Sequence, residues 1–133
     1  GKEFGTVTGR RRRAGWLDCV MLRQAVRLNS LTELALTKLD ILDGFETIRI
    51  CTGYRLDGRL LEHYPDRSEL IADVEPVYET IPGWGSVLSD KREPGQLPPE
   101  AKRFIEIVEA QVGVPVKVVG VGAERDDYLV WVS

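Results

Sequence analysis

Hydrophobic positions along the chain repeat first at helical spacing and then at strand spacing. Between residues 16 and 29 they recur every three or four positions and stop at Asn29-Ser30, which predicts a helix that packs on a sheet. Asp18 lies near its start, where a carboxylate favours the positive end of the helix dipole. The apolar run 34–36 that follows predicts a short buried strand.

The middle of the chain has the alternating pattern of antiparallel strands. Residues 47–54 alternate, and Asp57-Gly58 predicts a hairpin turn into residues 59–63. A short helix is expected over residues 67–74. Residues 76–84 contain two prolines and a glycine, and they predict a segment rich in turns.

The last third of the chain predicts a helix followed by two strands. Pro98-Pro99 suits a first helical turn, and one apolar stripe then continues until Gly113 ends it. Residues 116–121 and 128–132 predict strands joined by a polar turn. Before this helix, residues 85–95 are expected to form a mobile surface loop. The whole pattern predicts a mixed α/β fold with an antiparallel part.

The composition is that of one globular domain. The 133 residues are 43% hydrophobic and 29% charged, and 18 basic against 21 acidic residues leave a net charge of −3. This charge excludes a surface that is a nucleic-acid footprint throughout. The sequence shows no signal peptide and no long apolar span, so a cytoplasmic protein without a membrane partner is the default expectation.

A few single residues have plain structural interpretations. Cys19 and Cys51 lie in apolar segments without Cys-x-x-Cys spacing, which predicts two reduced, packed thiols rather than a disulfide or a metal site. His63, in the expected hairpin, is assigned to the surface. Packed positions are expected for Cys19, Met21, Trp84 and Trp131.

The tetrad Thr37-Lys38-Leu39-Asp40 directly follows the buried run. An aspartate there can accept two parallel hydrogen bonds from the ring N–H and the exocyclic amine of guanine, while the lysine stem covers the face of the base. Adenine offers no such pair of donors. The alternative is structural: a solvated strand end at Lys38, with Asp40 as the N-cap of a following turn.

An arginine cluster near the start of the chain is the second chemical feature. In Thr6-Val7-Thr8-Gly9-Arg10-Arg11-Arg12-Arg13, four guanidinium groups repel one another, so they suit a place where several anions bind. A solvated charged loop or a nucleic-acid patch are the alternatives, although only one aromatic residue, Trp16, follows nearby. The cluster alone leaves a small polyanionic ligand and a bland surface both open.

Five blocks of sequence, taken in order, resemble the adenylosuccinate synthetase family and span nearly the whole chain. They are residues 1–18 (GKEFGTVTGRRRRAGWLD), 36–44 (LTKLDILDG), 75–84 (EPVYETIPGW), Leu97-Pro98 and Gly113-Val114-Pro115. The resemblance implies an α/β fold, the C-terminal part of a P-loop NTPase-like mixed sheet with flanking helices and an antiparallel hairpin extension. It also divides the chain into an aspartate-binding loop, residues 1–15, and an α/β region with guanine-binding strand ends, residues 16–133.

This family implies a GTP-dependent ligase of purine synthesis. It joins IMP and L-aspartate to give adenylosuccinate, GDP and phosphate, with Mg²⁺ as cofactor. GTP first phosphorylates the 6-oxygen of IMP, and the aspartate amine then displaces phosphate. The intact enzyme is expected to be a cytoplasmic homodimer that binds neither nucleic acid nor a membrane.

The family's binding residues can be carried over by position. Residues 6–12 resemble the loop that closes over aspartate: Thr6, Val7, Thr8, Gly9, Arg10, Arg11 and Arg12. Within this loop Thr8 and Arg10 would hold the carboxylates of aspartate, Arg10 would also contact IMP, and Arg12 would contact GTP. The guanine site would be formed by Lys38, Leu39 and Asp40 on one edge and by Gly120, Val121 and Gly122 on the other. A glycine-rich strand end permits close backbone approach to a base. The chain departs from the pattern of some relatives at Val7, Ala14, Gly120 and Ala123-Glu124.

Several functional parts of the family have no counterpart in this sequence. The phosphate loop, the Mg²⁺-binding aspartate, and the catalytic acid/base aspartate and histidine belong to the family's N-terminal part, so no catalytic or metal residue is assigned here. The chain starts at Gly1 without methionine, which predicts a fragment that is inactive alone, although a cleaved tag also leaves a glycine. The alternatives are a stand-alone guanine-nucleotide module and a nucleic-acid-binding module.

Overall fold

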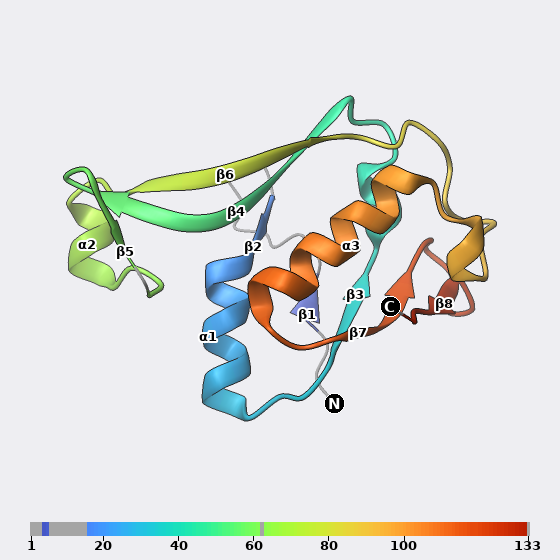
Figure 1. The fold of residues 1–133 in the computed structure, drawn as a ribbon, viewed down its shortest axis with the longest axis horizontal. Coiled ribbons are helices and arrows are strands. Elements are labelled where there is room, and N and C mark those ends of the chain that lie inside the picture. The colour runs from blue at the N-terminus through green and yellow to red at the C-terminus, as the bar shows by residue number, and fades with distance from the viewer. Residues whose placement is uncertain (1–3, 6–15, 62, 133) are drawn as a thin grey trace.

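The computed structural model describes residues 4–5, 16–61 and 63–132 (Figure 1). It is a mixed α/β fold with an antiparallel part, as the sequence pattern predicted, and its strands form two sheets. In chain order the elements are β1 (Phe4–Gly5), β2 (Leu17–Asp18), α1 (Cys19–Asn29), β3 (Leu34–Thr37), the 3₁₀ turn η1 (Leu39–Leu42), β4 (Thr47–Leu56), β5 (Arg59–Leu61), α2 (Arg67–Ile71), β6 (Glu75–Pro82), the 3₁₀ turn η2 (Pro94–Gln96), α3 (Pro99–Val112), β7 (Val116–Gly120) and β8 (Tyr128–Val130).

The first sheet has the order β1-β3-β7-β8. Its first three strands are parallel, with Gly5 beside Thr37 and Leu36 beside Val119, and β8 pairs antiparallel with β7. The carboxyl ends of β1, β3 and β7 therefore lie along one edge. This edge is where ligands bind in open sheets with parallel strands.

The second sheet is a long antiparallel ribbon of β4 and β6, with β2 and β5 also pairing with β4. Figure 1 shows the ribbon arching over α1 and α3 and carrying β5 and α2 at its far end. The hairpin predicted at Asp57-Gly58 is confirmed, because β4 and β5 pair antiparallel across this turn. Both residues have positive φ values, 53° and 78°, which asparagine, aspartate and glycine tolerate best.

Helices α1 and α3 pack on the sheets and enclose one hydrophobic core. The Arg23 guanidinium of α1 joins the two helices, since its Nε donates to the Gln111 carbonyl at 2.9 Å and its Nη2 to Gln111 Oε1 at 3.0 Å. Among the largest fully buried side chains are Leu36, Leu39, Ile48, Ile50, Leu88, Phe104, Ile105 and Leu129. The core thus reaches from α3 to the end of β3.

The two long helices follow the prediction closely, with one shift. Helix α1 begins at Cys19 rather than at residue 16, because Leu17 and Asp18 pair as a strand with Ile50 and Cys51 of β4. Asp18 is its N-cap, and the carboxylate accepts from the Met21 N–H at 3.0 Å. Gly113 ends α3 with φ at 88°, as expected for a left-handed cap.

The prediction of turns over residues 76–84 is wrong. Residues Glu75–Pro82 form β6, which pairs with β4 from Thr47 to Arg55. Proline cannot donate to a strand ladder, but β6 is an edge strand that pairs only with β4 among the described strands, and Pro76 and Pro82 lie close to its ends. Local sequence therefore suggested turns where a partner strand stabilises extended backbone.

Residues 85–95, predicted as a mobile surface loop, are anchored to the core. The Leu88 side chain is fully buried, and the Lys91 N–H donates to the Leu88 carbonyl at 2.9 Å. Trp84, which precedes the segment, is buried as expected and contacts Phe104 edge to face. The segment therefore lies mostly at the surface, as predicted, and Leu88 anchors it to the core.

The predicted core positions are confirmed except for one. Cys19 and Trp131 are buried, whereas the Met21 side chain is 38% exposed because its position on α1 faces away from the sheets. His63 lies at the surface, as predicted, with its Nε2 3.0 Å from Glu69 Oε1. Among the described helices, none has the length and apolar character needed to cross a membrane.

Both cysteines are free and buried, as predicted. Burial raises the pKa of the Cys19 thiol to about 12 and that of Cys51 to about 11, and the nearby Asp18 carboxylate adds to both shifts. A thiol reacts as its thiolate, so neither side chain is a nucleophile near neutral pH. Their role is packing.

Candidate functional site

The carboxyl ends of β1, β3 and β7 lie next to one another in the first sheet. Strand pairing brings Gly5, at the end of β1, beside Thr37, at the end of β3. Gly120, at the end of β7, lies against the same residue, since a Cβ on Gly120 would be 3.2 Å from the Thr37 Cα. Gly5, the start of the Thr37–Asp40 tetrad and Gly120 thus lie together at one edge.

The tetrad turns sharply as β3 ends. Lys38 has left-handed backbone, with φ at 57° and ψ at 40°, and this single residue directs the chain from β3 into η1. The Lys38 side chain is exposed, whereas Leu39 is fully buried and anchors the turn in the core. The alternative assignment of Asp40 as an N-cap is wrong, because Lys38 occupies that position and Asp40 lies inside η1.

Asp40 carries an unsatisfied carboxylate oxygen. Its Oδ1 is buried and has no hydrogen-bond partner among the described residues. Buried polar atoms nearly always have partners, so Oδ1 is a candidate acceptor for a group from outside the described residues. An ionised carboxylate accepts hydrogen bonds and cannot donate them, so the group that would satisfy Oδ1 is a hydrogen-bond donor.

The two glycines opposite the tetrad are explained by packing within the chain. A Cβ on Gly120 would lie 3.2 Å from the Lys38 nitrogen, and a Cβ on Gly122 would lie 2.4 Å from Asp127 Oδ2. The sequence suggested glycine here for close approach to a base. In the structure, Gly120 lets the ends of β3 and β7 approach each other, and Gly122 leaves room for the Asp127 carboxylate in the turn that follows β7.

Asp127 organises the turn that follows β7, a role that the sequence analysis did not predict. Its carbonyl accepts from the Val121 N–H at 2.8 Å, and its Oδ2 accepts from the Glu124 N–H at 3.0 Å. Val121 is fully buried. The backbone at Val121 is therefore held by Asp127, and an acidic residue seven positions after the glycine that ends β7 was the only signal in the sequence.

Residues 6–15, which include the predicted aspartate-loop positions Thr6, Val7, Thr8, Gly9, Arg10, Arg11 and Arg12, lie outside the described residues. The structure describes both flanks. Gly5 precedes the stretch beside Thr37, and Trp16 follows it with its ring 5.3 Å from the Phe45 ring, edge to face. Phe45 lies three residues after η1, so both flanks are attached close to the tetrad.

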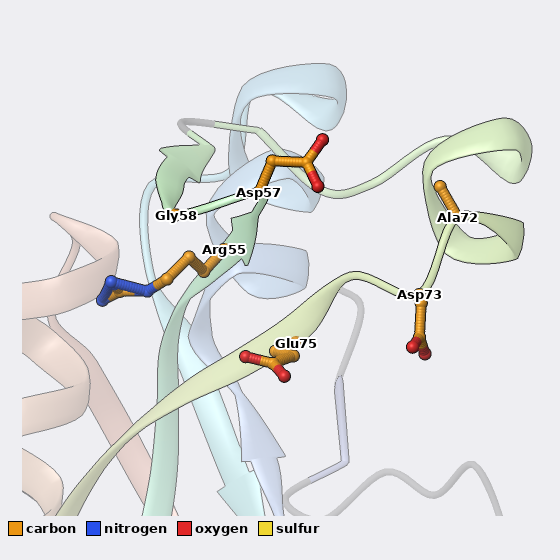
Figure 2. A pocket seen from close by; sticks show the side chains of 6 residues that line it. All are labelled: Arg55, Asp57, Gly58, Ala72, Asp73 and Glu75. Carbon is orange, nitrogen blue, oxygen red and sulfur yellow. The ribbon is translucent and has the colours of Figure 1, made fainter.

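A cavity of about 300 Å³ lies elsewhere, at the far end of the ribbon (Figure 2). It is lined by Arg55, Asp57, Gly58, Ala72, Asp73 and Glu75. Figure 2 shows that the Arg55 guanidinium and the Asp57 carboxylate point in different directions, and the acidic side chains do not converge. Among the described residues no group of three or more His, Cys, Asp or Glu side chains could hold a metal ion.

The sequence profile of adenylosuccinate synthetase matches residues 1–129. The chain belongs to the adenylosuccinate synthetase family. Among its relatives, the adenylosuccinate synthetase of Halothermothrix orenii is 49% identical over 127 residues, which cover 96% of this chain and 30% of that protein. The adenylosuccinate synthetase of Polynucleobacter necessarius is 50% identical over 127 residues, covering 96% of this chain and 28% of that protein.

A solved structure of the family has the same fold. Fully ligated adenylosuccinate synthetase from Plasmodium falciparum matches with a TM-score of 0.82 and 38% identity, over 88% of this chain and 28% of that one. The chain therefore spans less than a third of the length of the family members it matches.

Proposed function

We propose that this chain supplies the guanine-binding and aspartate-binding parts of a GTP-dependent adenylosuccinate synthetase. The observation that carries the proposal is the Oδ1 of Asp40, which is buried at the carboxyl edge of a parallel sheet and has no partner among the described residues. Guanine presents two adjacent donors, its N1–H and its 2-amino group, to which one carboxylate can accept side by side. Adenine would leave the buried oxygen unsatisfied.

The remaining guanine contacts are assigned to the same strand ends. The exposed Lys38 stem would cover the face of the base, and Leu39 would fix the turn from below. The backbone of Gly120, Val121 and Gly122 would form the opposite edge, held against β3 by the close approach of Gly120 to Thr37. Arg12 would contact the nucleotide from the arginine cluster.

Residues 6–12 are proposed as the loop that binds aspartate, with Thr8 and Arg10 on its carboxylates and Arg10 also close to IMP. The attachment of both flanks near the tetrad supports one shared site. In the proposed reaction GTP transfers its γ-phosphoryl group to the 6-oxygen of IMP. The amine of aspartate then displaces phosphate from the purine carbon that carries this oxygen. Guanidinium groups would stabilise the negative charge of the two carboxylates and the departing phosphate.

The rest of the active site is assigned to parts of the enzyme beyond this sequence. The first sheet would be the C-terminal part of a larger, P-loop NTPase-like sheet, and the intact enzyme would act as a cytoplasmic homodimer. Mg²⁺ would be held by those other parts, where it supplies charge stabilisation for phosphoryl transfer. The contribution of this chain is base selection and aspartate binding.

Nucleotide preference tests the proposal. The assay uses a full-length chimera in which this chain replaces the corresponding segment of the Halothermothrix orenii protein, to which it is 49% identical. We expect adenylosuccinate to form with GTP and not with ATP, while this chain alone gives no product. Equal turnover with GTP and ATP would contradict guanine selection, and product formation by the chain alone would contradict the proposed division of the site.

Replacing Arg10 by leucine in the chimera tests the aspartate loop. Removing a charge-assisted contact to a carboxylate costs roughly 1.5–3 kcal/mol, so we expect the KM for aspartate to rise about 10- to 100-fold while the KM for GTP changes far less. Arg13→Leu, which removes the same charge from a position without an assigned contact, is the matched control. Similar changes for both substrates, or in both variants, would refute the role of Arg10.

A further inference from the structure

Residues 84–96 connect the two edges of the proposed guanine site, and we call this segment the brace. At its start, the Trp84 indole Nε1 donates to Asp43 Oδ1 at 2.8 Å, and the Leu88 N–H donates to Asp43 Oδ2 at 3.3 Å. Asp43 directly follows η1 and is its C-cap. The carboxylate at the end of the tetrad turn is therefore held by one end of the brace.

Arg92 holds the other edge. Its Nη2 donates to Asp127 Oδ1 at 2.8 Å, and its Nη1 donates to the Ser89 and Lys91 carbonyls, both at 2.7 Å. The Arg92 main-chain N–H donates to Gln96 Oε1 at 2.7 Å. The backbone of the brace thus holds the guanidinium in place beside Asp127. Less side-chain entropy is therefore lost when the ion pair with Asp127 forms.

Asp127 links Arg92 to the segment 120–122. Its Oδ1 pairs with Arg92, its Oδ2 accepts from the Glu124 N–H at 3.0 Å, and its carbonyl accepts from Val121 at 2.8 Å. The Asp127 side chain is 16% exposed and that of Arg92 is 47% exposed, so the ion pair is shielded from solvent on the Asp127 side only. Without Arg92, Asp127 Oδ1 would lose the only charged partner that it has among the described residues, and the turn would lose its anchor to the brace.

We propose that Arg92 is a positioning residue for GTP: through Asp127 it fixes the backbone edge of the guanine site at the distance from Asp40 that the base requires. The inference rests on the proposed function. It assigns a role in nucleotide binding to a segment for which the proposed function gives no contact with the base or the phosphates. The pre-organised edge lowers the cost of ordering the site when the nucleotide binds.

Arg92→Gln in the chimera tests this role. We expect the KM for GTP to rise roughly tenfold, with kcat and the KM for aspartate changed by less than about twofold, since only the guanine edge is loosened. Arg92→Lys keeps one charged donor and should recover part of the loss. Lys91→Gln is the matched control, because Lys91 is the neighbouring cation and pairs with Asp90 at 3.1 Å, away from the turn.

A double-mutant cycle with Asp127→Asn separates positioning from general stability. If Arg92 acts through Asp127, the effect of Arg92→Gln on the KM for GTP should nearly vanish when Asp127 is already asparagine. Additive effects, an unchanged KM for GTP, or an equal loss with every substrate would each overturn the proposal. The Asp40→Asn variant distinguishes failure of the positioning role from failure of the guanine site. If Asp40→Asn alters the use of GTP and Arg92→Gln does not, only the positioning role is wrong. If Asp40→Asn has no effect, the guanine site itself is wrong.

Discussion

Asp40→Asn in the full-length chimera is expected to lower kcat/KM for GTP by roughly 10²–10⁴-fold and to confer use of xanthosine triphosphate. Each hydrogen bond from guanine to the ionised carboxylate contributes about 1.5–3 kcal/mol, and each 1.4 kcal/mol corresponds to a factor of ten. The asparagine side chain replaces one acceptor by a donor, which opposes the 2-amino group of guanine. Xanthine has a carbonyl oxygen there and restores the pair.

The control for this substitution is Asp126→Asn. Asp126 is exposed in the turn opposite the tetrad, so its replacement removes the same charge close to the site without touching the position assigned to the base. Steady-state kinetics with both nucleotides measure the ratio of kcat/KM values. An unchanged ratio in the Asp40 variant would refute the base-reading assignment, and the same change in the Asp126 variant would trace the effect to charge alone.

Gly83→Ala is expected to destabilise the fold by about 3 kcal/mol or more. A Cβ at this position would lie 1.9 Å from the Phe45 carbonyl oxygen and 3.0 Å from its carbon, and both atoms belong to backbone that cannot rotate away. The Gly83 N–H also donates to the Glu46 carbonyl at 2.8 Å, which fixes the two segments together. The strain would displace Trp84, whose indole holds Asp43.

Urea denaturation followed by tryptophan fluorescence measures this loss, with Gly44→Ala as the control. A Cβ on Gly44 would meet nothing within 4 Å, and its φ is not in the left-handed region, so alanine there should change the free energy of unfolding by less than about 0.5 kcal/mol. If both variants have the same urea midpoint, the close approach between residues 45 and 83 is not rigid in solution.

Local patterns were enough to predict most of the elements. The stripe of apolar residues with Gly113 at its end specified α3, and the turn Asp57-Gly58 specified the β4–β5 hairpin, because helix periodicity and turn chemistry are properties of neighbouring residues. The errors occurred where distant residues decide. The β6 strand exists because β4 pairs with it, and Leu17 is extended because it lies beside Ile50.

The candidate site divides in the same way. The residue types of the tetrad predicted a carboxylate suited to guanine, and the structure adds that Asp40 Oδ1 is buried without a partner in the described part of the chain. It also adds a reason for glycine at positions 120 and 122 that the sequence did not suggest, since a Cβ at either position would meet other atoms of the chain. The sequence did not predict the ion pair between Arg92 and Asp127, because no local pattern relates two residues that are 35 positions apart.

By itself, the sequence determined the order of most helices and strands, the chemistry of the tetrad and the density of cations near the start of the chain. Tertiary structure alone decided that the ends of β1, β3 and β7 meet at one edge, and that the brace joins Asp43 to Asp127. The physical reason is one of range. Propensity and periodicity act over a few residues, whereas strand register, close backbone approach and the burial of a polar atom depend on segments that only the folded chain brings together.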